Sequence, residues 1–211
     1  MAYITVDDAG ENSIVVASGA NALVTGDAAS AALAEVPADA VLLLQGELSA
    51  SVVETVASLA RERGLRFVLN LAPVSSRDVA VLATADPLVV NETEAADLLG
   101  EEHAEPHRAL RERYGVDVVV TVGAQGALVA STAGVWRQPS PVPAAVVDTT
   151  GAGDAFVGVL AAALCAGREL EEAVARGVVA ASHSVAGAGT VTSYADRALL
   201  ATLEAPSIVR Q

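Results

Sequence analysis

Short, almost wholly apolar runs alternate with longer amphipathic segments along this chain, and this alternation restricts the fold more than any other feature. Strands at a wetted surface alternate apolar and polar residues, whereas a run such as 40–45 (AVLLLQ) is apolar on both faces. Helices must cover such strands on both sides, so the sequence predicts a three-layer α/β/α fold with a largely parallel sheet. The expected strands are 40–45, 66–70, 87–90 and 117–122, and the expected helices are 49–64, 94–99, 106–114, 153–166, 170–186 and 196–204.

Shorter strands are expected at both sides of this core. Residues 3–6 and 13–17 are predicted to be strands joined by a turn-rich connection, and 127–130 with 135–137 are predicted to form a hairpin. No repeat, low-complexity segment or linker interrupts the pattern. We therefore expect a single domain over residues 1–211.

The composition limits the core and the location of the protein. Hydrophobic residues make up 53% of the chain and aromatic residues only 3%, so the core must be built from Val, Leu and Ala. The single cysteine, Cys165, allows no intrachain disulfide, which is typical of a cytoplasmic protein. Because it lies in an apolar run, we expect a buried small side chain rather than a reactive thiol. That run, 155–167, is too short to span a bilayer.

The net charge excludes two classes of partner. At −14, the chain repels nucleic acid and anionic membrane surfaces. An anionic substrate would therefore need a local site made of backbone donors or a metal ion.

The segment 148–158 (DTTGAGDAFVG) contains such a local site. Gly151, Ala152 and Gly153 allow backbone N–H groups to converge on an anion at the start of a helix. Asp154 would repel a phosphate, but it is well placed to take a proton from a hydroxyl that attacks a phosphoryl group. The alternative is an ordinary helix with an aspartate near its N-terminus after a glycine turn.

Polar residues follow the expected strands, where ligands bind in parallel sheets. They are 45–47 (QGE), Asn70, 91–94 (NETE) and 121–126 (TVGAQG). Each has two interpretations. Gly123 and Gly126 would let the backbone approach a nucleotide, or they belong to a plain hairpin turn. Residues 91–94 would organise a hydrated Mg²⁺, or they cap a helix. Glu47 would bind a polyhydroxylated substrate, or it is a solvated loop carboxylate.

The three histidines give weaker signals. His103 and His107 have i, i+4 spacing but flank Pro106, and no third ligand is near in the sequence, so we expect no structural metal site. His183 lies in a helix of small residues and is interpreted as a packing residue or a neighbour of a bound base.

In order and spacing, these segments resemble the ribokinase (PfkB-type) carbohydrate kinase family. The resemblance rests on 148–158, 118–128 (VVVTVGAQGAL), 91–95 (NETEA), 69–73 (LNLAP) and 10–21 (GENSIVVASGAN), and it covers essentially the whole chain. The glycine motifs of dinucleotide-binding dehydrogenases and P-loop NTPases are absent.

The resemblance implies a role for each matching residue. Asp154 would be the base and would contact the sugar, with Gly151, Ala152 and Gly153 as the anion hole for the γ-phosphoryl group. Glu47 would bind the sugar, and Glu94 would order Mg²⁺ through water. The implied ATP contacts are Asn91, Thr121, Val122, Gly123, Ala124, Gln125, Gly126, Gly153 and Asp154. The implied K⁺ site comprises Asp148, Thr150, Ser184, Gly187, Gly189 and Ser193, several through backbone carbonyls.

The chain also departs from the family pattern. The family's N-terminal third, with an aspartate and a glycine-rich loop that hold the sugar, has no counterpart here. Residues 1–18 would be the remnant of the family's lid, with strands 3–6 and 13–17 lacking partners, and 19–211 the nucleotide-binding core.

The implied activity is ATP-dependent phosphorylation of D-ribose, by an enzyme that is a homodimer in its full-length form. The segments 91–95 and 10–16 favour ribose. Two alternatives stay open: another sugar or nucleoside kinase of the same fold, or a non-catalytic nucleotide-binding fragment.

Overall fold

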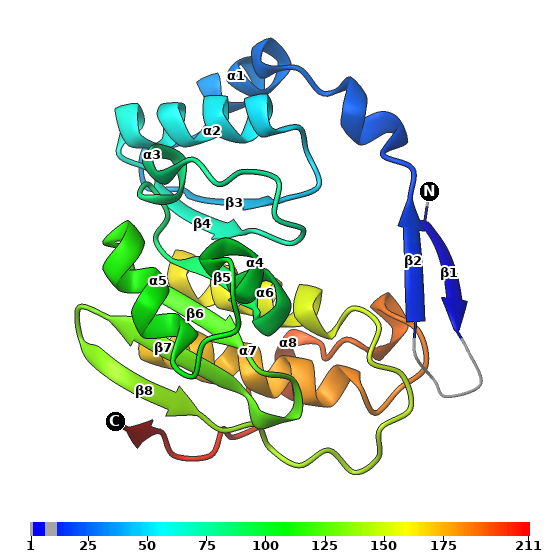
Figure 1. Ribbon diagram of the computed structural model, residues 1–211. Coiled ribbons are helices and arrows are strands. Elements are labelled where there is room, and N and C mark those ends of the chain that lie inside the picture. The colour runs from blue at the N-terminus through cyan, green and yellow to red at the C-terminus, as the bar shows by residue number, and fades with distance from the viewer. Residues whose placement is uncertain (1, 7–11) are drawn as a thin grey trace.

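The computed structural model describes residues 2–6 and 12–211, which form two separate sheets (Figure 1). The expected turn over 7–12 lies outside the described residues except for Asn12, which begins a strand, and Gly10 and Glu11 of the 10–21 segment lie outside them as well. The larger sheet has seven strands in the order β3-β4-β5-β6-β7-β8-β9, so each strand lies beside its neighbour in sequence. This arrangement confirms the predicted α/β class.

The first four strands of the large sheet are parallel. They are β3 (Val41–Gln45), β4 (Arg66–Asn70), β5 (Leu88–Asn91) and β6 (Val118–Thr121). Gln45 pairs with Asn70, and Asn91 pairs with Thr121. The polar residues at the carboxyl ends of these strands therefore lie along one edge of the sheet, as the sequence predicted.

Each of the last three strands pairs antiparallel with the strand before it, so three of the six strand pairs in the described sheet are parallel. β7 (Ala127–Ser131) and β8 (Gly134–Gln138) form the expected hairpin, and the unpredicted β9 (Val209–Arg210) pairs with β8. The core on this side contains Trp136, which is fully buried.

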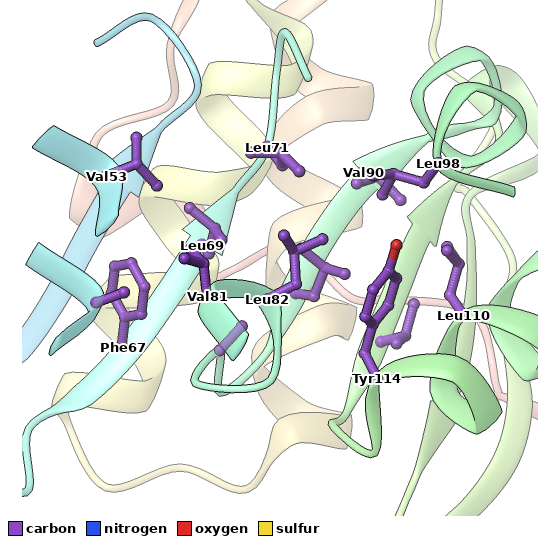
Figure 2. Close-up of a cluster of buried hydrophobic side chains, with 14 of the residues drawn as sticks. Val53, Phe67, Leu69, Leu71, Val81, Leu82, Val90, Leu98, Leu110 and Tyr114 are labelled. Atoms are coloured by element: carbon purple, nitrogen blue, oxygen red, sulfur yellow. The ribbon is translucent and has the colours of Figure 1, made fainter. Parts of the chain in front are cut away.

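One face of the sheet is covered by the helices of the first half of the chain (Figure 1). They are α1 (Gly26–Ala34), α2 (Ala50–Arg63), α3 (Val79–Leu82), α4 (Glu92–Leu99) and α5 (Pro106–Tyr114). Of these, α1 and α3 were not predicted. Figure 2 shows Phe67 and Leu69 of β4 and Val90 of β5 packed against Leu82, Leu98 and Leu110 from these helices.

The opposite face is covered by α6 (Ala152–Cys165) and α7 (Leu170–Ser184), with the short α8 (Arg197–Leu200) outside them. Gly177 of α7 is buried against the ring and carbonyl of Phe156 on α6, which lets the two helices approach closely. The expected helix 196–204 is confirmed only for its first turn, which Asp196 caps through the N–H of Leu199. In the described residues, every helix is too short or too polar to cross a membrane.

The two N-terminal strands form their own sheet. β1 (Ala2–Val6) and β2 (Asn12–Val16) are antiparallel to each other and stand beside the large sheet without joining it (Figure 1). The expected isolation from the core sheet is therefore seen, but each strand has the other as a partner. The division at residue 18 stays a prediction.

β3 was expected to be buried, and that is wrong. It lies at the edge of the large sheet, its residues are only partly buried, and Leu43 is 37% exposed. An apolar strand is covered on both faces only where a further strand and its helix continue the layers, and none of the described segments lies beyond β3.

Cys165 was expected to be buried, and it is exposed. It lies at the end of α6 on the outward side with the exposed residues Gly158 and Ala162, while Leu160, Ala163 and Leu164 face the core. A helix in an outer layer buries only one face, so an apolar run does not by itself bury every residue in it.

Candidate functional site

The N-terminus of α6 has the geometry of an anion site. Gly151 has a φ of +78°, which favours glycine, and α6 begins at the next residue, so the first-turn N–H groups of Gly153 and Asp154 have no acceptor within the helix. A Cβ on Gly153 would meet nothing within 4 Å, so the space above it is open. The side chain of Asp154 is exposed in the same turn. Donors and carboxylate are therefore adjacent, as the sequence predicted.

Tyr194 stabilises this turn through a hydrogen bond to Gly151, and the sequence did not predict this contact. Its hydroxyl donates to the carbonyl of Gly151 at 3.1 Å, and a Cβ on Gly151 would lie only 2.5 Å from that hydroxyl. Burial, and secondarily the charge of Asp154, raise the pKa of Tyr194 above 10, which keeps the hydroxyl a donor. Tyr194 lies 43 positions from Gly151 in the sequence, so no local motif could have indicated this contact.

Asp148 joins the two segments of the implied cation site. One carboxylate oxygen accepts from the N–H of Thr150 at 2.9 Å, and the other accepts from the N–H of Gly189 at 3.0 Å. These donors hold the pKa of Asp148 below its usual value, so it is ionised at neutral pH. Ser184 and Ser193 are buried, and Gly187 lies against Ser193. All six implied residues are thus in the two segments that the Asp148 carboxylate bridges.

Asn91 and Glu94 form a capping box at the start of α4. The Asn91 side chain accepts from the N–H of Glu94 at 2.9 Å, and Glu94 accepts from the N–H of Asn91 at 2.7 Å. Burial raises the pKa of Glu94 above its ordinary value. The capping interpretation is therefore confirmed, while the roles of these residues toward ATP and Mg²⁺ stay predictions.

Residues 118–128 form the expected strand, glycine turn and strand. A single 3₁₀ turn (Gly123–Gln125) connects β6 to β7, and the Arg137 guanidinium donates to the Gln125 carbonyl at 3.2 Å. Gly126 has a φ of +97°, and a Cβ there would overlap the carbonyl of Gln138. The turn therefore needs glycine for packing as well as for its backbone conformation.

A pocket of about 480 Å³ lies between this turn and the start of α6. Its wall includes Thr121, Gly123, Ala124 and Gly126 on one side, and Thr149, Ala152 and Gly153 on the other. The loop from Ser140 to Val146 and the end of α7 close the remaining sides. Asn91, Val122, Gln125 and Asp154 were also expected at a nucleotide and are not part of this wall.

Two polar contacts involve the end of β3 and the residues just after it. The Gln45 side-chain amide at the end of β3 donates to Oδ1 of Asp154 at 3.5 Å, a contact absent from the sequence predictions. The Asn21 amide donates to Oε2 of Glu47 at 3.2 Å. Gly46, between Gln45 and Glu47, is buried against the carbonyl of Pro73. Glu47 is thus an exposed carboxylate that neighbours the end of β3.

The three histidines lie in different environments. His107 is buried in α5, while His103 is exposed and accepts from the N–H of Glu105 through Nδ1 at 3.0 Å. His183 is half-buried, and although its neighbour Ser182 lines the pocket, His183 itself does not. In the part of the chain that is described, no group of three or more His, Cys, Asp or Glu side chains is placed to hold a metal ion.

Comparison with known proteins places this arrangement in a family. Residues 1–197 match the model of the pfkB family carbohydrate kinases. The chain is 36% identical over 203 residues to the ribokinase of Haemophilus influenzae, covering 93% of this chain and 66% of that protein. It is 34% identical to the ribokinase of Mus musculus, covering 92% of this chain and 63% of the relative. It thus spans slightly less than two thirds of these relatives.

The fold matches as well. A solved structure of Arabidopsis thaliana ribokinase, complexed with ribose and ATP, superimposes with a TM-score of 0.79 at 26% identity, covering 95% of this chain and 67% of that one. The match to the family model includes the α6 N-terminus, the glycine turn and all the described residues that line the pocket. This chain therefore belongs to the pfkB family of carbohydrate kinases.

Proposed function

We propose that this chain carries the nucleotide-binding and proton-abstracting part of an ATP-dependent sugar kinase, which converts D-ribose and ATP to D-ribose 5-phosphate and ADP. One observation carries the proposal. Ala152 and Gly153 line the end of the 480 Å³ pocket, and Asp154 follows them directly in the first turn of α6. Phosphates bound at that N-terminus would therefore lie beside a carboxylate.

The proposed chemistry uses these groups in one step. Asp154 takes the proton of the sugar's primary hydroxyl as the hydroxyl oxygen attacks the γ-phosphorus. The bond from that phosphorus to the β,γ-bridging oxygen breaks, and ADP leaves. The N–H groups of the Gly151–Gly153 anion hole stabilise the charge on the transferring group. Phosphoryl transfer depends almost entirely on such positioning and charge stabilisation.

The lack of charged side chains in the described wall of the pocket favours a requirement for cations. Among the described residues that line it, none is charged, so only neutral donors, backbone N–H groups and hydroxyls, would face the nucleotide phosphates. Glu94 fits an indirect role toward Mg²⁺, since Oε2 accepts the N–H of Asn91 and Oε1 can accept from a metal-bound water. The ionised Asp148 fits K⁺, a hard cation that prefers oxygen ligands. The cations would supply charge neutralisation.

The acceptor is proposed from the other side of Asp154. Gln45, Glu47 and Asn21 offer amide and carboxylate groups that suit a polyhydroxylated molecule. The ribokinases among the similar proteins support ribose over other acceptors. Since the chain spans about two thirds of those relatives, we propose that the rest of such a kinase completes the sugar contacts.

Two measurements test the proposal. Titration calorimetry should detect ADP binding to the purified chain in the presence of Mg²⁺ and K⁺. A coupled ADP-release assay should find no ribose-stimulated turnover from the chain alone. Turnover should appear in a chimera that joins the N-terminal part of the Haemophilus ribokinase to this chain.

The outcomes separate the alternatives. A chimera that binds ADP but releases none with ribose would indicate a nucleotide-binding fragment without catalysis. Turnover that responds to a nucleoside such as inosine and not to ribose would indicate a nucleoside kinase. Absence of any ADP binding would contradict the proposal altogether.

A further inference from the structure

A second cavity lies on the outward side of α6 and α7, and we call it the outer groove. Its volume is about 900 Å³, within the range of small-molecule sites. Its walls come from residues 159–166 of α6 and its end, 172–179 of α7, and the segment 197–205, which begins with α8 beside α7 (Figure 1). Among the described residues, none lines both this groove and the 480 Å³ pocket. The match to the family ends at residue 197, so one wall of the groove lies beyond it.

The outer groove gathers positive charge in an acidic protein. Arg168, Arg176 and Arg197 line it, and Glu172 is the one acidic side chain in its described wall. The whole chain has 26 acidic residues and only 12 basic ones, so three arginines in one wall are a quarter of all its basic side chains. The surplus of two positive charges gives the groove a potential opposite to that of the chain as a whole.

One of the three guanidinium groups is free to bind a ligand. Oε1 of Glu172 accepts from Nη2 and Nε of Arg176 at 2.8 and 2.9 Å, and Oε2 lies 3.7 Å from Nη1 of Arg168. The Arg197 guanidinium has neither a hydrogen bond nor an ion pair with any residue that the structure describes. A guanidinium binds phosphate or carboxylate through two parallel N–H groups. Arg197 is therefore available to an anion that enters the groove.

The rest of the wall is apolar. Val159, Val179, Leu200 and Leu203 line the groove, with alanines between them. Leu200 and Leu203 are only half-buried, so a ligand that covers them removes apolar surface from water. Charge at one part of the wall and apolar surface at another suit a ligand that has both an anionic group and an apolar body.

We propose that the outer groove binds a phosphomonoester with an apolar body. The phosphate pairs with Arg197 and with the outer N–H groups of Arg168 and Arg176, while the apolar part lies on Leu200 and Leu203. A phosphomonoester carries nearly two negative charges at neutral pH, which matches the surplus on the wall, whereas a carboxylate carries one. The groove is thus a second binding site, separate from the site around Asp154 and independent of the proposed function.

Cys165 allows a direct test, because it lines the groove, is exposed and is the single cysteine of the chain. Iodoacetamide, a small neutral reagent, alkylates it, and mass spectrometry follows the rate. The probe is 1-naphthyl phosphate, with no nucleotide added. It should slow the alkylation with a half-maximal concentration below about 1 mM. Inorganic phosphate and 1-naphthol, which each have only half of the required chemistry, should protect at least tenfold more weakly.

Three variants test where the probe lies, with alkylation and calorimetry as the two measurements. Arg197→Gln should weaken binding of the probe at least about fivefold, because it removes the unpaired guanidinium. Ala162→Glu places a carboxylate in the wall at an exposed position of α6 and should weaken it more than tenfold. Arg61→Gln, at an exposed arginine of α2 outside the groove, is the matched control and should change nothing.

Several results would overturn the proposal. They are a lack of binding by the probe at millimolar concentration, equal protection by 1-naphthol, and an unchanged affinity in Arg197→Gln. A further one is shielding of Cys165 that rises with the concentration of the chain when no probe is present, because a second copy of the chain would then occupy the groove.

Discussion

The side-chain amide of Gln45 lies 3.5 Å from Oδ1 of Asp154, which joins the end of β3 to the first turn of α6 across 109 residues of sequence. The contact restrains the carboxylate that we propose as the base. It also makes the position of Asp154 depend on β3, a strand at the edge of the sheet. Changes at the β3 edge should therefore affect the site as well as the fold.

Asp154→Asn, made in the active chimera, should remove turnover while the affinity for ATP stays nearly the same. The amide keeps the shape of the carboxylate but cannot take the proton, and general base catalysis contributes about 10²–10⁴ in rate. Steady-state kinetics and calorimetry measure the two quantities. Gln45→Ala serves as a comparison and should lower kcat less, because it removes only a restraint. A loss below about tenfold in Asp154→Asn would rule out the base.

Potassium should strengthen nucleotide binding or turnover, because Asp148 bridges the two segments of the implied cation site. Replacing K⁺ with a large organic cation at constant ionic strength should weaken both. Asp148→Ala should abolish the difference between the two buffers. Asp39→Ala, an exposed carboxylate elsewhere, is the matched control. Identical kinetics of the unaltered protein in both buffers would contradict the cation site.

His107 should make the fold sensitive to mild acid. Burial is the main effect that lowers its pKa below 6.5, with Arg108 adding to it and Gln211 and Glu105 opposing it. Well above pH 6.5 the imidazole is neutral in both the folded and the unfolded chain. Below that pH the unfolded chain takes up a proton that the folded chain resists, so the free energy of unfolding falls as the pH falls.

Thermal unfolding between pH 7.5 and 5.5 measures this effect. His107→Leu fills a similar volume without a titratable group and should reduce the loss of stability over that range. An equal loss in both proteins would show that other groups are responsible.

Two helical glycines should respond in opposite directions to alanine. At Gly158 on the exposed side of α6, a Cβ meets nothing within 4 Å, so Gly158→Ala should stabilise the protein by about 0.5–1 kcal/mol. At Gly177 a Cβ would lie 2.9 Å from the carbonyl oxygen of Phe156, which is backbone and cannot rotate away. Gly177→Ala should destabilise by about 1–3 kcal/mol. Denaturant unfolding compares the two, and equal changes would contradict the close packing of α6 and α7.

The edge of β3 should promote self-association of the isolated chain. Its backbone groups on the outer side are unpaired within the described sheet, and Leu43 is 37% exposed. Leu43→Lys should lower the average mass measured by light scattering. Leu23→Lys, at an exposed leucine outside the sheets, should not. If both variants associate as the unaltered chain does, another surface is responsible.

The sequence by itself determined the fold class and most of the elements. The apolar strands β4, β5 and β6, the helices α2 and α5, and the β7–β8 hairpin lie within a residue or two of their expected positions, because periodicity and terminal glycines are local signals. The same local chemistry predicted the proposed anion site, since a glycine turn followed by a helix presents free N–H groups without help from distant residues. α3 was missed because a single turn is too short to show a period, and α1 because small residues give it little periodicity to detect.

Tertiary structure alone decided how the site is supported and which residues it exposes. Tyr194 on Gly151, Gly189 on Asp148 and Gln45 on Asp154 are contacts between segments at least 41 residues apart, and no local pattern encodes such distances. The exposure of β3 and Cys165 could not be predicted from the apolar residues around them in the sequence. Whether a residue is buried depends on which segments pack over it in the folded chain. The capping box of Asn91 and Glu94 is a local interaction, so the sequence could indicate it. Only the tertiary structure shows that neither residue belongs to the pocket wall.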